Sequence, residues 1–192
     1  MNTRAIVAGL LLALSLAGSP ALSTAAEPEL DIAALRLATA GRWTGKLEYR
    51  DYSADRWFGL PMTVRIENQG DGVTLIRKAD FDDGPKVGTV RITTVELLDP
   101  ATGIETSASF RKGRKPELDS AALRLTAPAL DATHWTLVAE TDGRDDDRPA
   151  RLRVTTVRDG AVMTTLKEVD FLDDAGEAWI QRNRTTLTRV GG

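Results

Sequence analysis

Residues 37–50 read Leu-Ala-Thr-Ala-Gly-Arg-Trp-Thr-Gly-Lys-Leu-Glu-Tyr-Arg, and their second part alternates between two kinds of side chain. One set contains Trp43, Gly45, Leu47 and Tyr49, and the residues between them are Thr, Lys and Glu. Alternation with a period of two is typical of a β-strand that turns one face to a core. The stretch therefore predicts a half-buried first strand over Arg42–Arg50.

The same rhythm of strand, acidic or glycine turn, and strand continues to the end of the chain. Asn68-Gln69-Gly70-Asp71-Gly72 and Asp159-Gly160 are hairpin turns of residues that tolerate positive φ. The residues 117–125 are ambiguous, because one helical turn before a strand also fits them. The further predicted strands are Trp57–Glu67, Val73–Ala79, Val87–Leu98, Ile104–Phe110, one centred on Leu123 and Leu125, Thr133–Thr141, Ala150–Val157, Ala161–Phe171 and Ala178–Val190.

About ten strands with short connections predict an antiparallel all-β fold, and sequential hairpins favour an up-and-down β-barrel over a sandwich. Ahead of the first strand, acids near Pro28 and a run of Ile and Leu at helical spacing predict a short N-terminal helix within residues 27–40. A frayed tail is the alternative for that segment.

The first 26 residues have the composition of a secretory signal peptide. Arg4 precedes an apolar run that is too short to span a bilayer, and small residues from Ala21 to Ala26 follow it. We expect cleavage after Ala26, with cleavage after Ala25 or an uncleaved anchor as alternatives, so residues 27–192 form one barrel domain. An exported chain without cysteine has neither a lipid-anchor site nor a disulfide, and we expect it in the periplasm or secreted.

Charge narrows the classes of partner. The formal net charge is −3 at pH 7, and the calculated isoelectric point is about 5.3. Nucleic acids and anionic membrane surfaces attract basic proteins, so neither is expected as a partner. No stretch after residue 26 is long and apolar enough to predict a membrane span.

The first predicted strand also carries a family resemblance. Gly41-Arg42-Trp43-Thr44-Gly45, after a short helical lead-in, resembles the Gly-x-Trp signature of lipocalins and the wider calycin group. The stretch Leu47–Tyr52 is similar to uncharacterised bacterial exported lipocalin-like proteins. The resemblance implies a barrel with a ligand pocket, in which Trp43 closes one end and packs on a basic residue of the last strand. Three arginines of that strand qualify: Arg182, Arg184 and Arg189.

Two features depart from that group. The chain ends in a strand and Gly191-Gly192, where lipocalins have a helix after the barrel. The connection Asp51–Arg56 has no room for the helix pair that covers fatty-acid-binding proteins. The identity of any ligand therefore stays open.

Polar side chains on otherwise apolar strand faces suggest a binding site. Thr94 and Glu96 follow Val90 and Ile92, and Thr106 follows Ile104. In the last strand, Arg182 and Arg184 share a face with Ile180 and Val190. If these faces turn inward, apolar walls with a few polar groups suit a small apolar or amphipathic ligand. Alternatively, these positions lie at strand ends and meet water. The candidate ligand-binding residues are Tyr49, Tyr52, Glu96, Arg182 and Arg184.

No cofactor, metal or catalytic site is predicted. His134 is the one histidine in the sequence. Strand alternation places it on the other face from Trp135, away from the interior, so haem ligation is disfavoured. The acidic turns at residues 80–83 and 142–147 offer oxygen ligands for calcium but lack EF-hand spacing. No cysteine nucleophile and no Gly-x-Ser-x-Gly elbow is present, which argues against an enzyme. The leading hypothesis is a small-ligand carrier, and the alternative is an envelope structural or protein-interaction module with a filled core.

Overall fold

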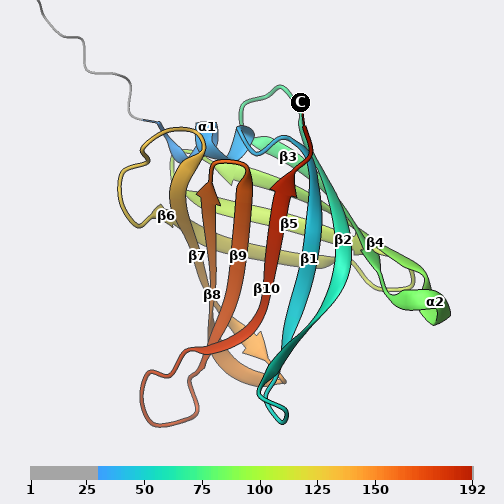
Figure 1. Cartoon of the computed structure of the whole chain (residues 1–192). Coiled ribbons are helices and arrows are strands. Elements are labelled where there is room, and N and C mark those ends of the chain that lie inside the picture. The colour runs from blue at the N-terminus through green and yellow to red at the C-terminus, as the bar shows by residue number, and fades with distance from the viewer. Residues whose placement is uncertain (1–29, 192) are drawn as a thin grey trace, which may run out of the picture.

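The computed structural model describes residues 30–191, which form ten antiparallel strands and two short helices (Figure 1). The predicted signal peptide, residues 1–26, lies outside the described residues. The elements are α1 (Ile32–Leu37), β1 (Gly41–Asp51), β2 (Arg56–Asn68), β3 (Thr74–Asp82), α2 (Gly84–Val87), β4 (Thr89–Asp99), β5 (Ile104–Arg111), β6 (Glu117–Leu125), β7 (His134–Asp145), β8 (Arg148–Asp159), β9 (Val162–Phe171) and β10 (Ile180–Arg189).

Each strand pairs with the next strand in the sequence, and β10 returns to pair with β1. The closing seam runs from Trp43 opposite Arg189 to Tyr49 opposite Asn183. The sheet is therefore a closed up-and-down barrel, which confirms the predicted fold class and leaves no unpaired strand edge. In the described part of the chain, no helix has the length and apolar character needed to cross a membrane.

Helix α1 lies across one end of the barrel, which we call the closed end (Figure 1). The Asp31 side chain caps the helix by accepting a hydrogen bond from the Ala34 amide at 2.7 Å. Leu35 is fully buried and packs with Leu98, Leu123 and Trp135 from the strands below. The helix thus covers the barrel with its apolar side, and the opposite end, where β1 turns into β2, is the open end.

Two local predictions need correction. Residues 117–125 form strand β6 throughout, so the helical alternative for their first turn is wrong. The connection from β3 to β4 contains the one-turn helix α2 where a simple turn was expected, and Val87 belongs to this helix instead of the following strand. Pro85, the second residue of α2, lies in the first turn of the helix, where a missing backbone amide costs no intrahelical hydrogen bond.

The register of β5 reverses the face that the sequence pattern suggested. Glu105 is opposite the buried Leu98, and Ser107 is opposite Glu96, so these polar residues face the interior. Ile104 and Phe110, with Thr106 and Ala108 between them, therefore lie on the outer face. Ile104 is 42% exposed and Phe110 is 47% exposed. The expected inward turn of Thr106 is wrong, because pairing with β4 overrides the apolar alternation.

Candidate functional site

The interior of the barrel holds a cavity of about 370 Å³ below α1. Its walls are mainly apolar, and a volume of this size is typical of small-ligand sites. Threonine side chains from four strands add hydroxyl groups to these walls. The apolar lining includes Met62, Val64, Phe81, Ile92, Leu137 and Leu187, and the threonines are Thr94, Thr156, Thr165 and Thr185.

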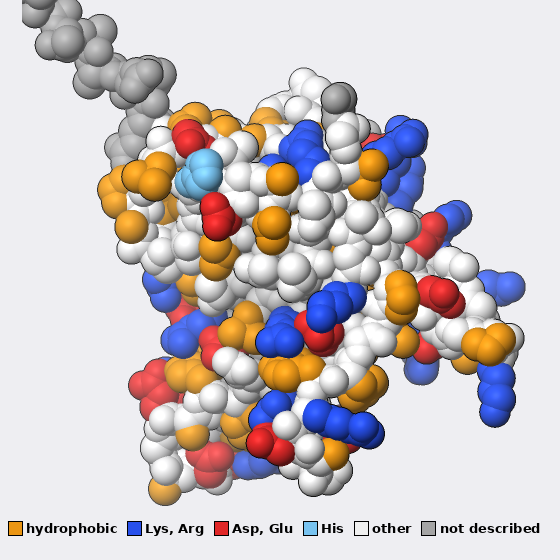
Figure 2. Space-filling model, in the orientation of Figure 1, with side chains coloured by type: hydrophobic (Ala, Val, Ile, Leu, Met, Phe, Trp, Pro, Cys, Tyr) orange, Lys and Arg blue, Asp and Glu red, His pale blue; other side chains and the backbone are white. Residues whose placement is uncertain are grey.

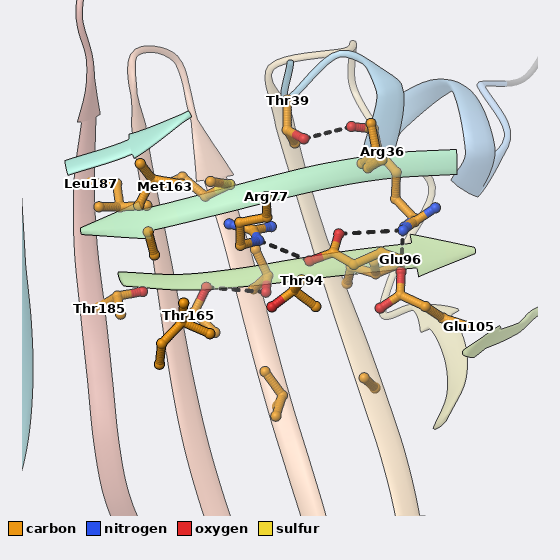
Figure 3. A pocket seen from close by; sticks show the side chains of 18 of the residues that line it. Arg36, Thr39, Arg77, Thr94, Glu96, Glu105, Met163, Thr165, Thr185 and Leu187 are labelled. Carbon is orange, nitrogen blue, oxygen red and sulfur yellow. Dashed lines mark hydrogen bonds and ion pairs between the residues drawn. The ribbon is translucent and has the colours of Figure 1, made fainter. Parts of the chain in front are cut away.

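Four charged side chains meet at one side of this cavity: Arg36, Arg77, Glu96 and Glu105. Figure 3 shows Arg36 reaching down from α1 to Glu96 and Glu105. The Arg36 guanidinium forms an ion pair with Glu105 and lies 3.5 Å from a Glu96 carboxylate oxygen. Arg77 donates a hydrogen bond from Nε to Glu96 Oε1 at 2.8 Å. We call these four residues the interior charge cluster.

The cluster changes the protonation of its members. Burial raises the pKa of Glu105 to about 7, and the neighbouring negative charge of Glu96 adds to this effect. The two arginines oppose the rise without cancelling it. Arginine side chains stay protonated in proteins, and the carboxylate of Glu96 raises the pKa of Arg77 further. The cluster is therefore neutral when Glu105 is ionised and carries one positive charge when Glu105 is protonated.

Glu105 should make the protein less stable as the pH rises towards and through neutrality. Its pKa is about 7 in the folded chain and 4.5 as a free side chain, so the folded chain binds more protons between these values. The contribution of Glu105 to the free energy of unfolding is therefore fully present below pH 4.5, and it is lost as the pH rises through 7. We expect Glu105→Gln to be more stable than the wild type at pH 8, by on the order of 1–2 kcal/mol, and to lose this advantage at pH 5. Urea unfolding followed by tryptophan fluorescence measures the difference.

The control for this experiment is Glu140→Gln. Glu140 lies on the outer face, and its pKa is lowered by the hydrogen bond from Arg153. Its titration therefore lies below the tested pH range, and the variant should keep the wild-type pH dependence. Parallel pH profiles for the wild type and Glu105→Gln would contradict the assignment.

Of the predicted ligand-binding residues, Glu96 lines the cavity. Tyr49 lies on the inner face of β1 at the open end, 38% exposed, and its ring stacks on Phe58 with centroids 5.6 Å apart. Tyr52 lies in the turn after β1, where its hydroxyl donates a hydrogen bond to the carbonyl oxygen of Gln181. Tyr49 and Tyr52 thus lie at the open end of the barrel, and neither is among the residues that line the cavity.

The two candidate binding arginines of the last strand, Arg182 and Arg184, separate because β10 bulges between Gln181 and Asn183. Arg182 forms ion pairs with Asp145 and Asp146 near the open end. Arg184 is opposite Glu48 on the outer face, and its Nε donates to Glu48 Oε2 at 2.8 Å. The expectation that Arg184 shares the inner face is wrong, since the extra residue of the bulge shifts the alternation.

Trp43 lies at the closed end and is 1% exposed. Its indole Nε1 donates a hydrogen bond to the carbonyl oxygen of Thr39 at 3.0 Å. The guanidinium of Arg189, in the last strand, lies 5.4 Å from the ring centroid, and that of Arg158 lies 4.3 Å away. Arg189 also donates hydrogen bonds to Ala38 and Ala40, which ties the chain ahead of β1 to the end of β10.

His134, the residue weighed for haem, lies outside the cavity. His134 contacts Asp131 and Thr133 at the start of β7, and its Nδ1 is 2.8 Å from the Asp131 carboxylate. Among residues 30–191, no group of three or more His, Cys, Asp or Glu side chains is arranged to hold a metal ion. On the face of β8 to β1, basic and acidic side chains intermingle without a patch of one sign (Figure 2).

Sequence reasoning missed three members of the cluster. Arg36 was hidden because it follows apolar residues in a short helix, and Glu105 because its neighbours Ile104 and Thr106 were expected to face inward. Arg77 gave a usable signal: it lies two residues from both Leu75 and Ala79, so strand alternation places a charge on a buried face.

No protein-family model matches the sequence, and no curated protein matches it. Among solved structures, Rv2717c from M. tuberculosis is similar, with a TM-score of 0.55 and 14% identity over 85% of this chain and 100% of that chain. The likeness is one of fold. A protein of unknown function from the DUF3598 family of Nostoc punctiforme aligns with a TM-score of 0.22 and 11% identity over 84% of this chain and 100% of that chain. Membership of the lipocalin group therefore stays a prediction.

Proposed function

We propose that this chain is an exported binding protein that holds a small, partly apolar ligand inside its barrel. The observation that supports it most is the interior charge cluster beside an apolar cavity of about 370 Å³. Removing four charged groups from water is costly, and apolar residues of similar volume commonly stabilise a core at least as well. A cluster of this kind is therefore better explained by recognition of a ligand than by stability.

We infer that a ligand enters the barrel from the open end. In the described part of the chain, α1 covers the closed end (Figure 1). At the other end, two aromatic side chains on the inner face are exposed. These are Tyr49 and Phe58, which are 38% and 51% exposed. Exposed aromatic surface on an inward face is typical of a site that meets an apolar partner.

Export is the second part of the proposal, and it rests on the composition of residues 1–26. A basic start, a short apolar run and small residues up to Ala26 are typical of a secretory signal. A chain without cysteine keeps the same covalent structure in an oxidising compartment, which suits a periplasmic or secreted carrier.

Filling the cavity should abolish binding. Thr165 lies on the inner face of β9 and lines the cavity. Thr165→Phe places a ring in this space, and we expect it to weaken the uptake of the apolar fluorophore N-phenylnaphthylamine by at least about tenfold, or 1.4 kcal/mol. A fluorescence titration of the processed protein measures the affinity.

The matched control is Thr164→Phe, one residue earlier on the outer face of β9, where Thr164 is opposite Thr186 and Val157. This variant should bind the fluorophore as the wild type does. Failure of the wild-type protein to take up the fluorophore would overturn the proposal, and so would equal uptake by the two variants.

One observation favours a second candidate, a protein-interaction module. The outer face of β4, β5 and β6 carries four exposed apolar side chains: Leu97, Ile104, Phe110 and Leu118. Apolar groups gathered on one face often mark contact surfaces. The interior cavity supports the first candidate over a module with a filled core.

A further inference from the structure

The terminal nitrogens of Arg77 donate no hydrogen bond to another group among residues 30–191. Arg77 uses Nε for its bond to Glu96 Oε1 at 2.8 Å. Although it lies on the inner face of β3, its side chain is 31% exposed, and the surface that it exposes faces the cavity. A guanidinium has five donors and no acceptor, so one edge of this group is free to bind.

We propose that Arg77 is the head-group site for an amphipathic carboxylate, whose apolar chain fills the cavity. This inference rests on the proposed carrier function and names its ligand class. The planar fork of Arg77 matches the two oxygens of a carboxylate, and such paired, charged hydrogen bonds are the strong ones. The apolar wall, with Phe81, Ile92 and Leu187, suits an alkyl chain beside it.

A carboxylate at Arg77 also meets negative charge from Glu96 and Glu105. Two cations face these carboxylates: Arg36 on α1 and Arg77 on β3. Their two positive charges balance two carboxylates but not three. Glu105 relieves the excess by taking up a proton as the ligand arrives. Burial already favours its neutral form, since its pKa is raised to about 7.

The test compares decanoate with decanol, which share an apolar chain and differ in the charged head. We expect the wild-type protein to bind decanoate roughly tenfold more tightly than decanol at pH 6, as a charged hydrogen bond predicts. In Arg77→Met/Glu96→Gln, which removes both members of the pair, the preference for decanoate should vanish while decanol binds as before. Displacement of N-phenylnaphthylamine reads out both ligands.

The matched control is Arg91→Met/Asp80→Asn. Arg91 and Asp80 also join β3 and β4, with Nε 2.6 Å from Oδ1, but they lie on the outer face. This variant should keep the preference. If both ligands bind the wild type equally, the head-group assignment is overturned and the carrier function stands. If neither binds, the carrier function fails as well.

Proton uptake gives an independent readout. The affinity for decanoate should fall severalfold between pH 6 and pH 8, whereas the affinity for decanol should stay constant, because decanoate remains ionised over this range. Glu105→Gln is neutral at both values and should bind decanoate tightly at pH 8. The coupling to Glu105 is overturned if the decanoate affinity of the wild type is the same at pH 6 and pH 8. It is also overturned if Glu105→Gln binds decanoate more weakly than the wild type at pH 8.

Discussion

Gly45→Val is expected to lower the free energy of unfolding by about 3 kcal/mol or more, because it forces the closing seam of the barrel apart. Gly45 lies in β1 opposite Leu187 of β10. A Cβ atom at this position would lie 1.9 Å from the carbonyl oxygen of Thr186 and 3.0 Å from the Leu187 Cα. Both contacts are with backbone, so no side-chain rotation relieves them, and the two strands must separate.

The comparison variant is Thr44→Val, which places the same side chain on the exposed outer face one residue earlier. It should change the free energy of unfolding by no more than about 0.5 kcal/mol. Urea unfolding followed by circular dichroism measures both variants. A loss of less than about 1 kcal/mol for Gly45→Val would show that β1 and β10 approach less closely than described.

The strands and their order could be predicted because short connections leave little choice. Alternation marks each strand, and sequential hairpins pair each strand with its neighbour. Thr89–Asp99 illustrates what the pattern supports: Ile92, Thr94 and Glu96 face the cavity as expected. The one-turn helix at residues 84–87 was missed, since a Gly-Pro pair indicates a turn equally well.

The composition of the interior could be predicted only in part. The bulge in β10 shifts its alternation and turns Arg184 outward, although a regular strand was expected there. In β5, register with β4 buries the polar side of the strand and exposes Ile104 and Phe110. The alternation along one strand indicates which residues share a face, but pairing with the neighbouring strand determines which face is inside the barrel.

The interior charge cluster shows why sites are harder to predict than folds. Its four members come from α1, β3, β4 and β5, and are separated by up to 69 positions in the sequence between Arg36 and Glu105. Pairing of β3 with β4 and of β4 with β5 brings three of them together, and the packing of α1 across the closed end adds Arg36. No spacing motif records that proximity. A charged residue within a buried alternation, as Arg77 is, remains the one signal that sequence reasoning can use.

Trp43→Ala is expected to destabilise the barrel by about 3–5 kcal/mol, the usual cost of removing a buried tryptophan. The ring is 1% exposed and packs with Met62, Val64, Met163 and Leu187 at the closed end. Its loss also breaks the hydrogen bond to Thr39 and removes the surface on which Arg158 and Arg189 rest. Burial and the nearby Arg189 already lower the pKa of Arg158, so that cation depends on the ring.

Trp57→Ala separates the effect of burial from the effect of the cations. Two arginines also flank Trp57, with Arg184 at 4.3 Å and Arg50 at 5.7 Å from its ring centroid, but this ring lies on the outer face of β2. Contacts of this kind at the surface contribute about 0.5–1 kcal/mol, so Trp57→Ala should cost about 1 kcal/mol. Equal losses for the two variants in urea unfolding would mean that stacking with arginine, and not the buried position at the closed end, is what makes Trp43 important. A larger loss of unfolding free energy for Trp43→Ala, partly restored in Trp43→Phe, would show that the closed end depends on the packed ring. The stability that Trp43→Phe still lacks would include the hydrogen bond to Thr39.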